Sequence, residues 1–304
     1  MQKELFHYWL GVIVIALSIL FSTRTVHSET TFMEDITEWS DPQKIRMPKT
    51  PRELSFADER FPINNFDVRN RIDRELLISC FGHSTMLLNW KVAHRYFPVI
   101  EPILKKHGVP EDFKYLAIAE SNLRNATSSA GAKGVWQFMH GTAREYNLRI
   151  SSDVDERYHL EKATEAACRY FKKAYKKFNS WTLAAASYNM GMGGLSREMK
   201  VQKEYYYQDL NLNSETNRYV FRILAIKEVM EHPSLYGYDL NGPDLFEPLK
   251  SKSVPVDTTI QSLADFAHNY NMTYRMLKVY NPWLINNKLS NPNGEQYEIK
   301  VAVE

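Results

Sequence analysis

The sequence has few of the residues that build metal centres and disulfide frameworks. It contains two cysteines, Cys80 and Cys168, among 304 residues. Two cysteines cannot form a zinc framework, and the nine histidines show no HExxH or comparable spacing. We therefore expect no metal site and no cofactor. The two cysteines could form one disulfide or remain two buried thiols, because both fall in helical segments with apolar neighbours.

Strong charge of either sign and the common nucleophile and nucleotide motifs are also missing. The formal net charge is +2, so nucleic acid is not an expected partner. There is no GxSxG motif, and the glycines of the segment 191–194 do not follow a strand, so they are not a dinucleotide loop. With 44% hydrophobic and 24% charged residues, the composition is that of a globular protein with one sizeable core and room for a small module.

Only one long apolar run is present, at residues 10–21 near the N-terminus. It is too short to span a bilayer comfortably, but it has the length of a signal-peptide core and follows Lys3. Residues 26–28 suit the −3 and −1 positions of a signal-peptide cleavage site. We therefore predict cleavage after Ser28, and thus export to the periplasm or cell envelope. An uncleaved N-terminal anchor is the alternative. No cysteine follows the run, so a lipoprotein attachment site is not expected.

The rest of the chain divides into four segments by composition and periodicity. Polar, proline-containing residues predict an extended arm at 29–67 and a linker at 233–253. The intervening segment 68–232 has helical periodicity throughout. The segment 254–304 changes to a β-α-α-β pattern. We therefore expect a mainly α fold with a small α+β module at the C-terminus.

Within these segments the pattern predicts individual elements. In the helical part, Pro98 is expected to separate two helices, residues 190–195 to form a loop, and Ser214 to be an N-cap. The helices are expected at 85–96, 99–107, 160–178 and 181–188. In the module, the strands are expected at 253–256 and 296–303, and the helices at 260–270 and 273–280.

Glu120 interrupts the apolar face of a short predicted helix. Phe113, Leu116 and Ala117 stand at the i, i+3 and i+4 positions of one face, and Glu120 follows at i+7. An average glutamate here is a solvated surface acid, since glutamates are seldom buried unpaired. However, a loop of small residues follows at 125–134. Because burial on an apolar face raises the pKa of a carboxyl, Glu120 is also a candidate general acid.

Two loops carry amides among apolar neighbours. Gln137 is the one amide in the loop 131–139. If this loop is only a buried turn between two helices, the amide of Gln137 needs hydrogen-bond partners there. Tyr188 and Asn189 end a short alanine-rich helix. An asparagine there is often only a cap, but the pair could equally present hydrogen bonds to a ligand.

Four segments in order resemble the motifs of the bacterial lytic transglycosylases of the soluble type, over roughly residues 97–230. The matching residues are Glu120-Ser121 with Ala126-Thr127-Ser128; Gly131-Ala132, Gly134, Trp136-Gln137-Phe138-Met139 and Thr142-Ala143; Ala185 to Asn189 with Gly191; and Glu215-Thr216 with Tyr219-Val220. Ser129, His140 and Met190 depart from the residues usual in the family and could adjust substrate fit. These departures lie beside the motif positions.

The segment 254–304 is similar to a LysM peptidoglycan-binding domain, as found in the membrane-bound D type of this family. Asn281-Pro282 matches the usual Asn-Pro of that domain. The segment 256–259 reads Val-Asp-Thr-Thr where the usual opening is Gly-Asp-Thr. The resemblance therefore implies a LysM-like module that lacks the usual opening motif.

The family resemblance implies a lysozyme-like helical fold and non-hydrolytic cleavage of the MurNAc–GlcNAc β-1,4 bond of peptidoglycan, leaving 1,6-anhydro-MurNAc ends. It implies that Glu120 is the catalytic residue, first as acid and then as base. By the same resemblance, the residues lining the substrate cleft are Ser128, Gln137, Met139, Tyr188, Asn189, Glu215 and Tyr219. The expected partners are peptidoglycan glycan strands and protein complexes of the cell envelope.

Two other functions remain open at this stage. A hydrolase of the same fold, similar to goose-type lysozyme, would need a second acid across the cleft. Asp153 and Asp155 are candidates for it by chain position only. A non-catalytic wall-binding protein is the third hypothesis, and the intact Glu120 with its neighbours argues against it.

Overall fold

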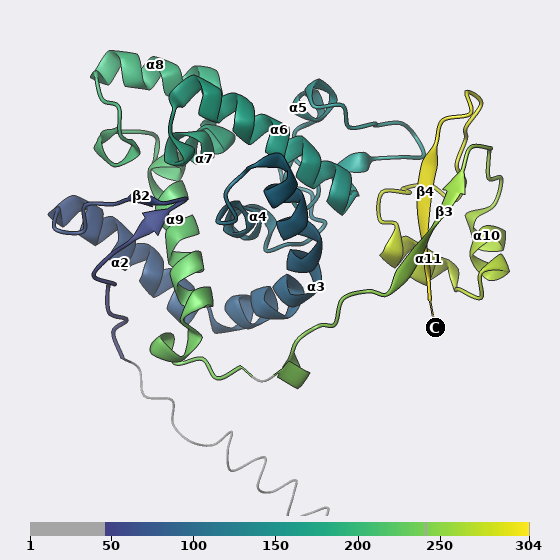
Figure 1. Cartoon of the computed structure of the whole chain (residues 1–304), viewed down its shortest axis with the longest axis horizontal. Helices are drawn as coiled ribbons and strands as arrows, with labels where there is room; N and C mark the ends of the chain where they lie inside the picture. Colours follow the sequence, from purple (N-terminus) through teal and green to yellow (C-terminus); the bar gives the residue numbers. More distant parts are fainter. Residues whose placement is uncertain (1–45, 241, 304) are drawn as a thin grey trace, which may run out of the picture. The chain divides into compact units, whose positions relative to one another are not determined.

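The computed structural model of the chain describes residues 46–240 and 242–303. The predicted signal segment 1–28 and residues 29–45 of the predicted arm 29–67 lie outside the described residues. The described part is mainly helical, as expected from the sequence (Figure 1). Its α-helices are α2 (Phe66–Phe81), α3 (His83–His107), α4 (Phe113–Ser121), α5 (His140–Glu145), α6 (Leu160–Phe178), α7 (Trp181–Met190), α8 (Met192–Gln202), α9 (Ser214–Glu231), α10 (Leu263–Asn269) and α11 (Tyr274–Tyr280).

Within the described residues, the strands are few and short and form two separate antiparallel pairs. β1 (Ser55–Phe56) pairs with β2 (Glu59–Arg60), and β3 (Ser251–Val256) pairs with β4 (Tyr297–Ala302). Short 3₁₀ turns occur at Glu156–Tyr158, Tyr207–Asp209, Pro233–Tyr236 and Gly242–Asp244.

Helix α6 occupies the predicted range, and its sequence explains why. Ala163, Ala167, Phe171 and Ala174 recur on one face and are fully buried, while the lysines of the last turns are exposed. Burying a side chain such as Phe171 contributes about 1.5–3 kcal/mol relative to leaving it in water. The helix ends at Asn179, whose φ of 50° is the left-handed conformation of a C-cap.

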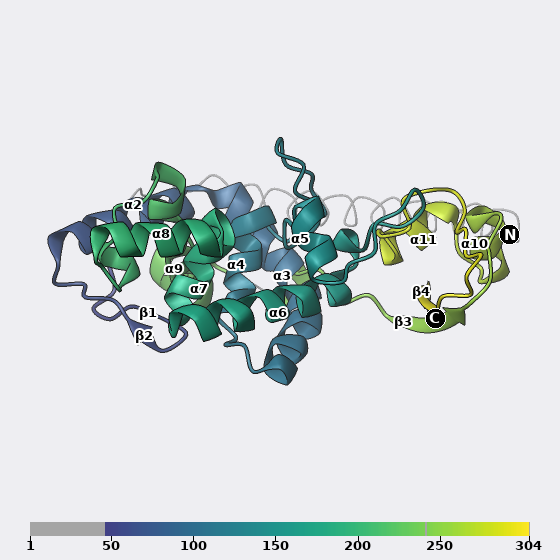
Figure 2. The same cartoon turned by 90° about the horizontal axis from the view of Figure 1, so that it is seen from above.

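The helical core is built around α9 and α6. Helix α9 packs along α2 and α4, and Figure 1 shows α2 and α9 side by side. Helix α6 packs against α3 on one side and α7 on the other, and Figure 2 shows α6 and α7 adjacent. This arrangement holds α4 and α7, which carry Glu120 and Tyr188, against the same core.

The prediction that Pro98 separates two helices was wrong. α3 is continuous from His83 to His107 and contains both Pro98 and Pro102. A proline inside a helix removes one hydrogen bond and disfavours the preceding turn. Here Ile100 and Leu104 are fully buried after it, and α3 packs against both α4 and α6. Tertiary burial therefore holds the helix through the prolines.

Two smaller expectations also need correction. Residues 190–195 are not all loop, because α8 begins at Met192 and only Gly191 makes the corner. Leu195 is fully buried and anchors that first turn despite its glycines. The N-cap of α9 is Asn213, one residue before Ser214. Its Oδ1 accepts from the backbone N–H groups of Glu215 (3.1 Å) and Thr216 (2.9 Å).

The hairpin of β1 and β2 connects the arm to the helical core. Phe56 is fully buried and packs edge-on against Phe113 of α4, with ring centroids 5.1 Å apart. Glu59 accepts hydrogen bonds from the backbone N–H groups of Trp181 (2.5 Å) and Thr182 (3.0 Å), in the first turn of α7. A carboxylate at a helix N-terminus satisfies unpaired donors and complements the helix dipole.

The C-terminal segment has the predicted β-α-α-β order. β3 and β4 pair in antiparallel register, with Val254 opposite Ile299. Leu263 of α10, Leu277 of α11 and Ile299 of β4 are fully buried in a hydrophobic cluster distinct from the main core. The module therefore has its own core.

Both cysteines are free and buried. Burial raises the pKa of the Cys80 thiol to about 11 and, as the largest cause, that of Cys168 to about 12. Their thiolates are therefore scarce at neutral pH, and the two residues are structural hydrophobes.

Candidate active site

Glu120 lies in the last turn of α4, a helix whose other faces are occupied by the core. Phe113, Leu116 and Ala117 are fully buried, as the apolar spacing predicted. The helix ends at Ser121, and Asn122 takes the left-handed conformation with φ of 51°. The helix therefore stops directly after Glu120, and the chain turns away from the carboxyl.

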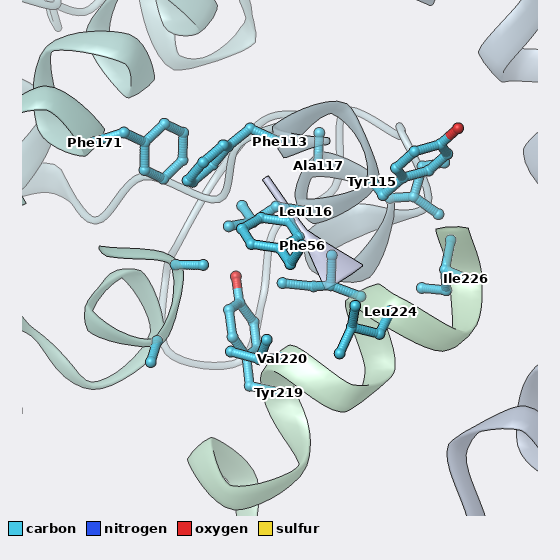
Figure 3. Packing of buried hydrophobic residues seen from close by; sticks show 14 of the residues in the cluster. Phe56, Phe113, Tyr115, Leu116, Ala117, Phe171, Tyr219, Val220, Leu224 and Ile226 are labelled. Atoms are coloured by element: carbon cyan, nitrogen blue, oxygen red, sulfur yellow. The ribbon is translucent and has the colours of Figure 1, made fainter. Parts of the chain in front are cut away.

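The carboxylate of Glu120 is partly buried and accepts a hydrogen bond from the phenol of Tyr219 on α9. Figure 3 shows the Tyr219 side chain pointing from α9 toward α4. Burial raises the pKa of Glu120 from an ordinary 4.5 to about 7, although the Tyr219 hydrogen bond opposes the change. A carboxyl with a pKa near 7 can donate and accept a proton at neutral pH, as the sequence reasoning anticipated.

Two charges on α9 also act on Glu120, with opposite signs. The Arg222 guanidinium lowers the pKa of Glu120, and the Glu215 carboxylate raises it. The two form an ion pair at 3.1 Å, with side chains 26% and 54% exposed. Because Glu215, Tyr219 and Arg222 are spaced at i, i+4 and i+7, they share one face of the helix.

The loop after α4 is held in place by its own hydrogen bonds. The hydroxyl of Ser121 donates to the carbonyl of Val135 (2.7 Å). Ser128 Oγ accepts from the backbone N–H of Ala132 (3.0 Å). Both hydroxyls thus hold the loop beside Glu120 in place. For the predicted cleft residue Ser128, this is a structural role.

Gln137 also uses its amide within this loop. Its Nε2 donates to the carbonyls of Gly134 (2.8 Å) and Ala126 (3.2 Å). The backbone of Gln137 has φ of 49°, an unusual value for a residue other than glycine. The hydrogen bonds that its setting requires are therefore supplied by the loop, and they hold the residue in its left-handed conformation.

Position 134 must be glycine, because the backbone of Arg157 lies close to it. Its φ is 81°, and a Cβ atom at this position would lie 1.8 Å from the carbonyl oxygen of Arg157. No side chain fits there. The glycine thus lets the loop pack directly on the segment that leads into α6.

Tyr188 and Asn189 lie in the last turn of α7. The Tyr188 phenol donates to the carbonyl of Trp136 (2.7 Å). Burial, followed by the negative charge of Glu120, holds the pKa of Tyr188 well above its ordinary value. Asn189 is exposed, and its Oδ1 accepts from the Thr216 hydroxyl (2.8 Å).

The sequence-predicted residues therefore differ in how they relate to Glu120. Tyr219 contacts it, and the negative charge of Glu120 raises the pKa of Tyr188. Glu215 acts on it through charge. The remaining predicted cleft residues lie on the adjoining segments: Ser128, Gln137, Met139 and Asn189. Met139 is 46% exposed and is the N-cap residue of α5.

Sequence reasoning missed Arg222. The signal was available, because Arg222 follows Tyr219 by three residues and Glu215 by seven, after the helix start predicted at Ser214. Its importance depends on where α9 lies relative to α4, which the helix pattern alone does not give.

Two protein-family models match this chain. The model described as "Transglycosylase SLT domain" matches residues 97–211. The model described as "Soluble lytic transglycosylase C-terminal LysM-like domain" matches residues 252–304. The first range contains Glu120 and the loops around it, and the second contains β3, α10, α11 and β4.

The chain is also similar to curated proteins and to a solved structure. Membrane-bound lytic murein transglycosylase D of Escherichia coli K12 is 29% identical over 211 residues, as is its counterpart in strain O6:H1. The match covers 67% of this chain and 46% of the relative, so the chain aligns with less than half of that protein. A structure of an inactive mutant of lytic transglycosylase Slt from Pseudomonas aeruginosa matches with 20% identity and a TM-score of 0.39, covering 52% of this chain and 27% of that one.

Proposed function

We propose that this chain, which carries an SLT transglycosylase domain at residues 97–211 and a LysM-like domain at 252–304, is a peptidoglycan lytic transglycosylase. It would cleave the MurNAc–GlcNAc β-1,4 bond without water and leave 1,6-anhydro-MurNAc ends. The observation that carries the proposal is the carboxyl of Glu120, whose pKa is raised by burial to about 7 beside Tyr219.

One carboxyl is sufficient for this reaction. Neutral Glu120 donates its proton to the glycosidic oxygen, and the GlcNAc side leaves with that proton. The acetamido group of the MurNAc residue supports the positive charge that develops at its C1. The ionised Glu120 then takes the proton of the C6 hydroxyl, whose oxygen bonds to C1 and closes the anhydro ring. Glu120 ends in its starting protonation state, and a pKa near neutrality suits both steps.

The charges around Glu120 support both roles. Burial favours the neutral acid that begins the reaction. The Tyr219 phenol and the Arg222 guanidinium favour the carboxylate that forms after proton donation. The cleft residues Ser128, Gln137, Met139, Tyr188, Asn189 and Glu215 are proposed to contact the sugars.

The hydrolytic alternative lacks support at its two candidate acids. Asp153 is 2% exposed and accepts hydrogen bonds from Asn286 Nδ2 (2.8 Å) and the Ser290 backbone N–H (2.9 Å). Asp155 is 1% exposed and accepts a bidentate pair of hydrogen bonds from Arg157, from Nη2 (2.7 Å) and Nε (2.9 Å). A general base must be within reach of a water at the sugar. Both carboxylates are buried and engaged in these hydrogen bonds, so neither is free to act as that base.

Product masses test the proposal directly. Purified sacculi digested by the full chain should release muropeptides with anhydro ends, each lighter by one water than a reducing end. Reducing ends would support the hydrolase, and no release at all would support a non-catalytic wall-binding protein. Glu120→Gln should abolish release and still sediment with sacculi, because it keeps the shape of the side chain. If lysis persists in that variant, Glu120 is not the acid.

The proposed place of action is the cell envelope, reached by export through the segment 1–28, which lies outside the described residues. Across residues 46–240 and 242–303, no helix is long and apolar enough to cross a membrane. Envelope protein complexes remain proposed partners. The domain boundaries at 68–232 and 254–304 likewise remain predictions.

A further inference from the structure

A basic hollow lies next to the candidate active site. It has a volume of about 640 Å³ and opens between α5, the C-terminal half of α6 and the start of α8. Among the residues that line it are Tyr146, Tyr170, Lys173, Lys176, Lys177 and Met192. None of these residues was among the site residues predicted from the sequence.

The walls of the hollow continue the walls of the proposed cleft. Met139 is the N-cap residue of α5, which forms one wall. Gly191, which lines the hollow, comes two residues after Asn189. The rings of Tyr170 and Tyr188 meet edge to face with centroids 5.0 Å apart. Tyr170, which lines the hollow, thus packs directly on Tyr188, one of the predicted cleft residues.

The charge in the hollow is positive. Lys173 pairs with Glu145 at 2.7 Å, with both side chains more than half exposed. The Lys177 ammonium donates to the backbone carbonyl of Met192 (3.2 Å). In the part of the chain that the structure describes, no carboxylate forms an ion pair with Lys176 or Lys177. Both ammonium groups therefore retain donors for an anionic ligand.

We propose that this hollow is an extension of the substrate cleft that binds the carboxylates of the peptide stems of peptidoglycan. The inference rests on the proposed function, since it takes peptidoglycan as the substrate. In a strand with intact stems the lactyl carboxyl of MurNAc is held in an amide bond, so the glycan backbone offers hydroxyl and acetamido groups but no charge. The carboxylates of a strand lie on the peptides that branch from the lactyl groups of MurNAc. Ammonium groups beside the cleft fit those carboxylates, and the faces of Tyr146 and Tyr170 suit the apolar parts of the stem.

Binding measurements can test this independently of catalysis. The full chain carrying Glu120→Gln would be titrated with two probes: soluble glycan strands with intact stems, and the same strands after enzymatic removal of the stems. Adding Lys176→Gln and Lys177→Gln should weaken binding of stem-bearing strands by about three- to tenfold, as expected for two partly exposed charge contacts. Stem-free strands retain one lactyl carboxylate on each MurNAc but lack the carboxylates of the stems, so their binding should weaken clearly less. The loss should diminish at high salt.

A matched control is available on α3. Lys105 and Lys106 are exposed and lie in the last turn of α3, as Lys176 and Lys177 lie in the last turn of α6. Replacing them by glutamine removes the same charge and the same helix-dipole contact. This control should leave both affinities unchanged.

The outcomes separate the two proposals. Equal weakening on both probes, or none on either, would overturn the stem-binding hollow. Reducing ends in the products of the unsubstituted chain would overturn the transglycosylase reaction and leave the binding comparison intact. Unchanged urea midpoints in the lysine variants would show that any weakening is not a loss of folding.

Discussion

The phenol of Tyr219 donates a hydrogen bond to the carboxylate of Glu120 across 99 positions of the sequence. Burial favours the neutral form of Glu120, and this hydrogen bond favours the ionised form. The two effects leave the pKa at about 7, where either protonation state is accessible near neutral pH. In the proposed mechanism, the contact therefore decides how well Glu120 can act first as acid and then as base.

Replacing Tyr219 by phenylalanine should raise the pKa of Glu120. The variant loses a hydrogen bond to a charged group, which contributes about 1.5–3 kcal/mol, so the alkaline limb of the pH–rate profile should move up by about one to two pH units. A weaker acid gives up its proton less readily, so kcat near pH 7 should fall about tenfold. The measurement is the rate of sacculus lysis from pH 5 to pH 10.

Tyr207→Phe is the control for this variant. Tyr207 is 1% exposed, and its phenol donates to the carbonyl of Thr216 (2.7 Å) rather than to Glu120. The control should lose stability without moving the alkaline limb. If Tyr219→Phe also leaves the limb in place, the hydrogen bond does not set the pKa of Glu120.

Glu215 and Arg222 should shift the pKa of Glu120 in opposite directions. Arg222→Gln removes a positive charge and should raise the pKa of Glu120, whereas Glu215→Gln removes a negative charge and should lower it. Because both side chains are partly exposed, each change should be a few tenths of a pH unit and should shrink at high salt. Carbon-detected NMR titration of the substrate-free chain measures this. A change of the same sign in both variants would contradict the expectation.

Much of the helical fold follows from periodicity. Helix α6 and the apolar face of α4 could be predicted because strict i, i+3 and i+4 spacing marks one buried face. The continuity of α3 through Pro98 could not be predicted, because it depends on packing against α4 and α6. The start of α8 at Met192 was also missed, since the glycines after it disfavour a helix until Leu195 is buried.

The candidate site shows a similar division. Glu120 is visible in the sequence as a carboxylate out of place on an apolar face. Its contact with Tyr219 joins two helices far apart in the chain, and no local pattern contains that information. Asp153 shows the converse case. It was a candidate acid by position, but Asn286 and Ser290 from the C-terminal module engage its carboxylate.

Glu59 should stabilise the helix that carries Tyr188. Glu59→Ala leaves the N–H groups of Trp181 and Thr182 without their carboxylate partner, which should cost about 1–2 kcal/mol of the free energy of unfolding. Urea unfolding measures the loss. Glu53→Ala is the control, because Glu53 is an exposed residue of the same arm and should change stability by less than about 0.5 kcal/mol. Equal losses in the two variants would mean that the cap contributes nothing specific.

The raised pKa of Glu120 should also appear in stability. Between pH 4.5 and pH 7 the folded chain holds a proton on Glu120 that the unfolded chain has released, so folding weakens as the pH rises through this window. The loss should approach about 3 kcal/mol above pH 7, because each pH unit of difference corresponds to about 1.4 kcal/mol. Glu120→Gln cannot ionise and should not show this loss. The variant should therefore gain stability relative to the parent chain between pH 4 and pH 8, measured by urea unfolding at both values. Other groups titrate equally in the two chains and cancel in the difference. A difference that stays constant with pH would mean that Glu120 ionises near its ordinary pKa, and the single-carboxyl mechanism would lose its physical basis.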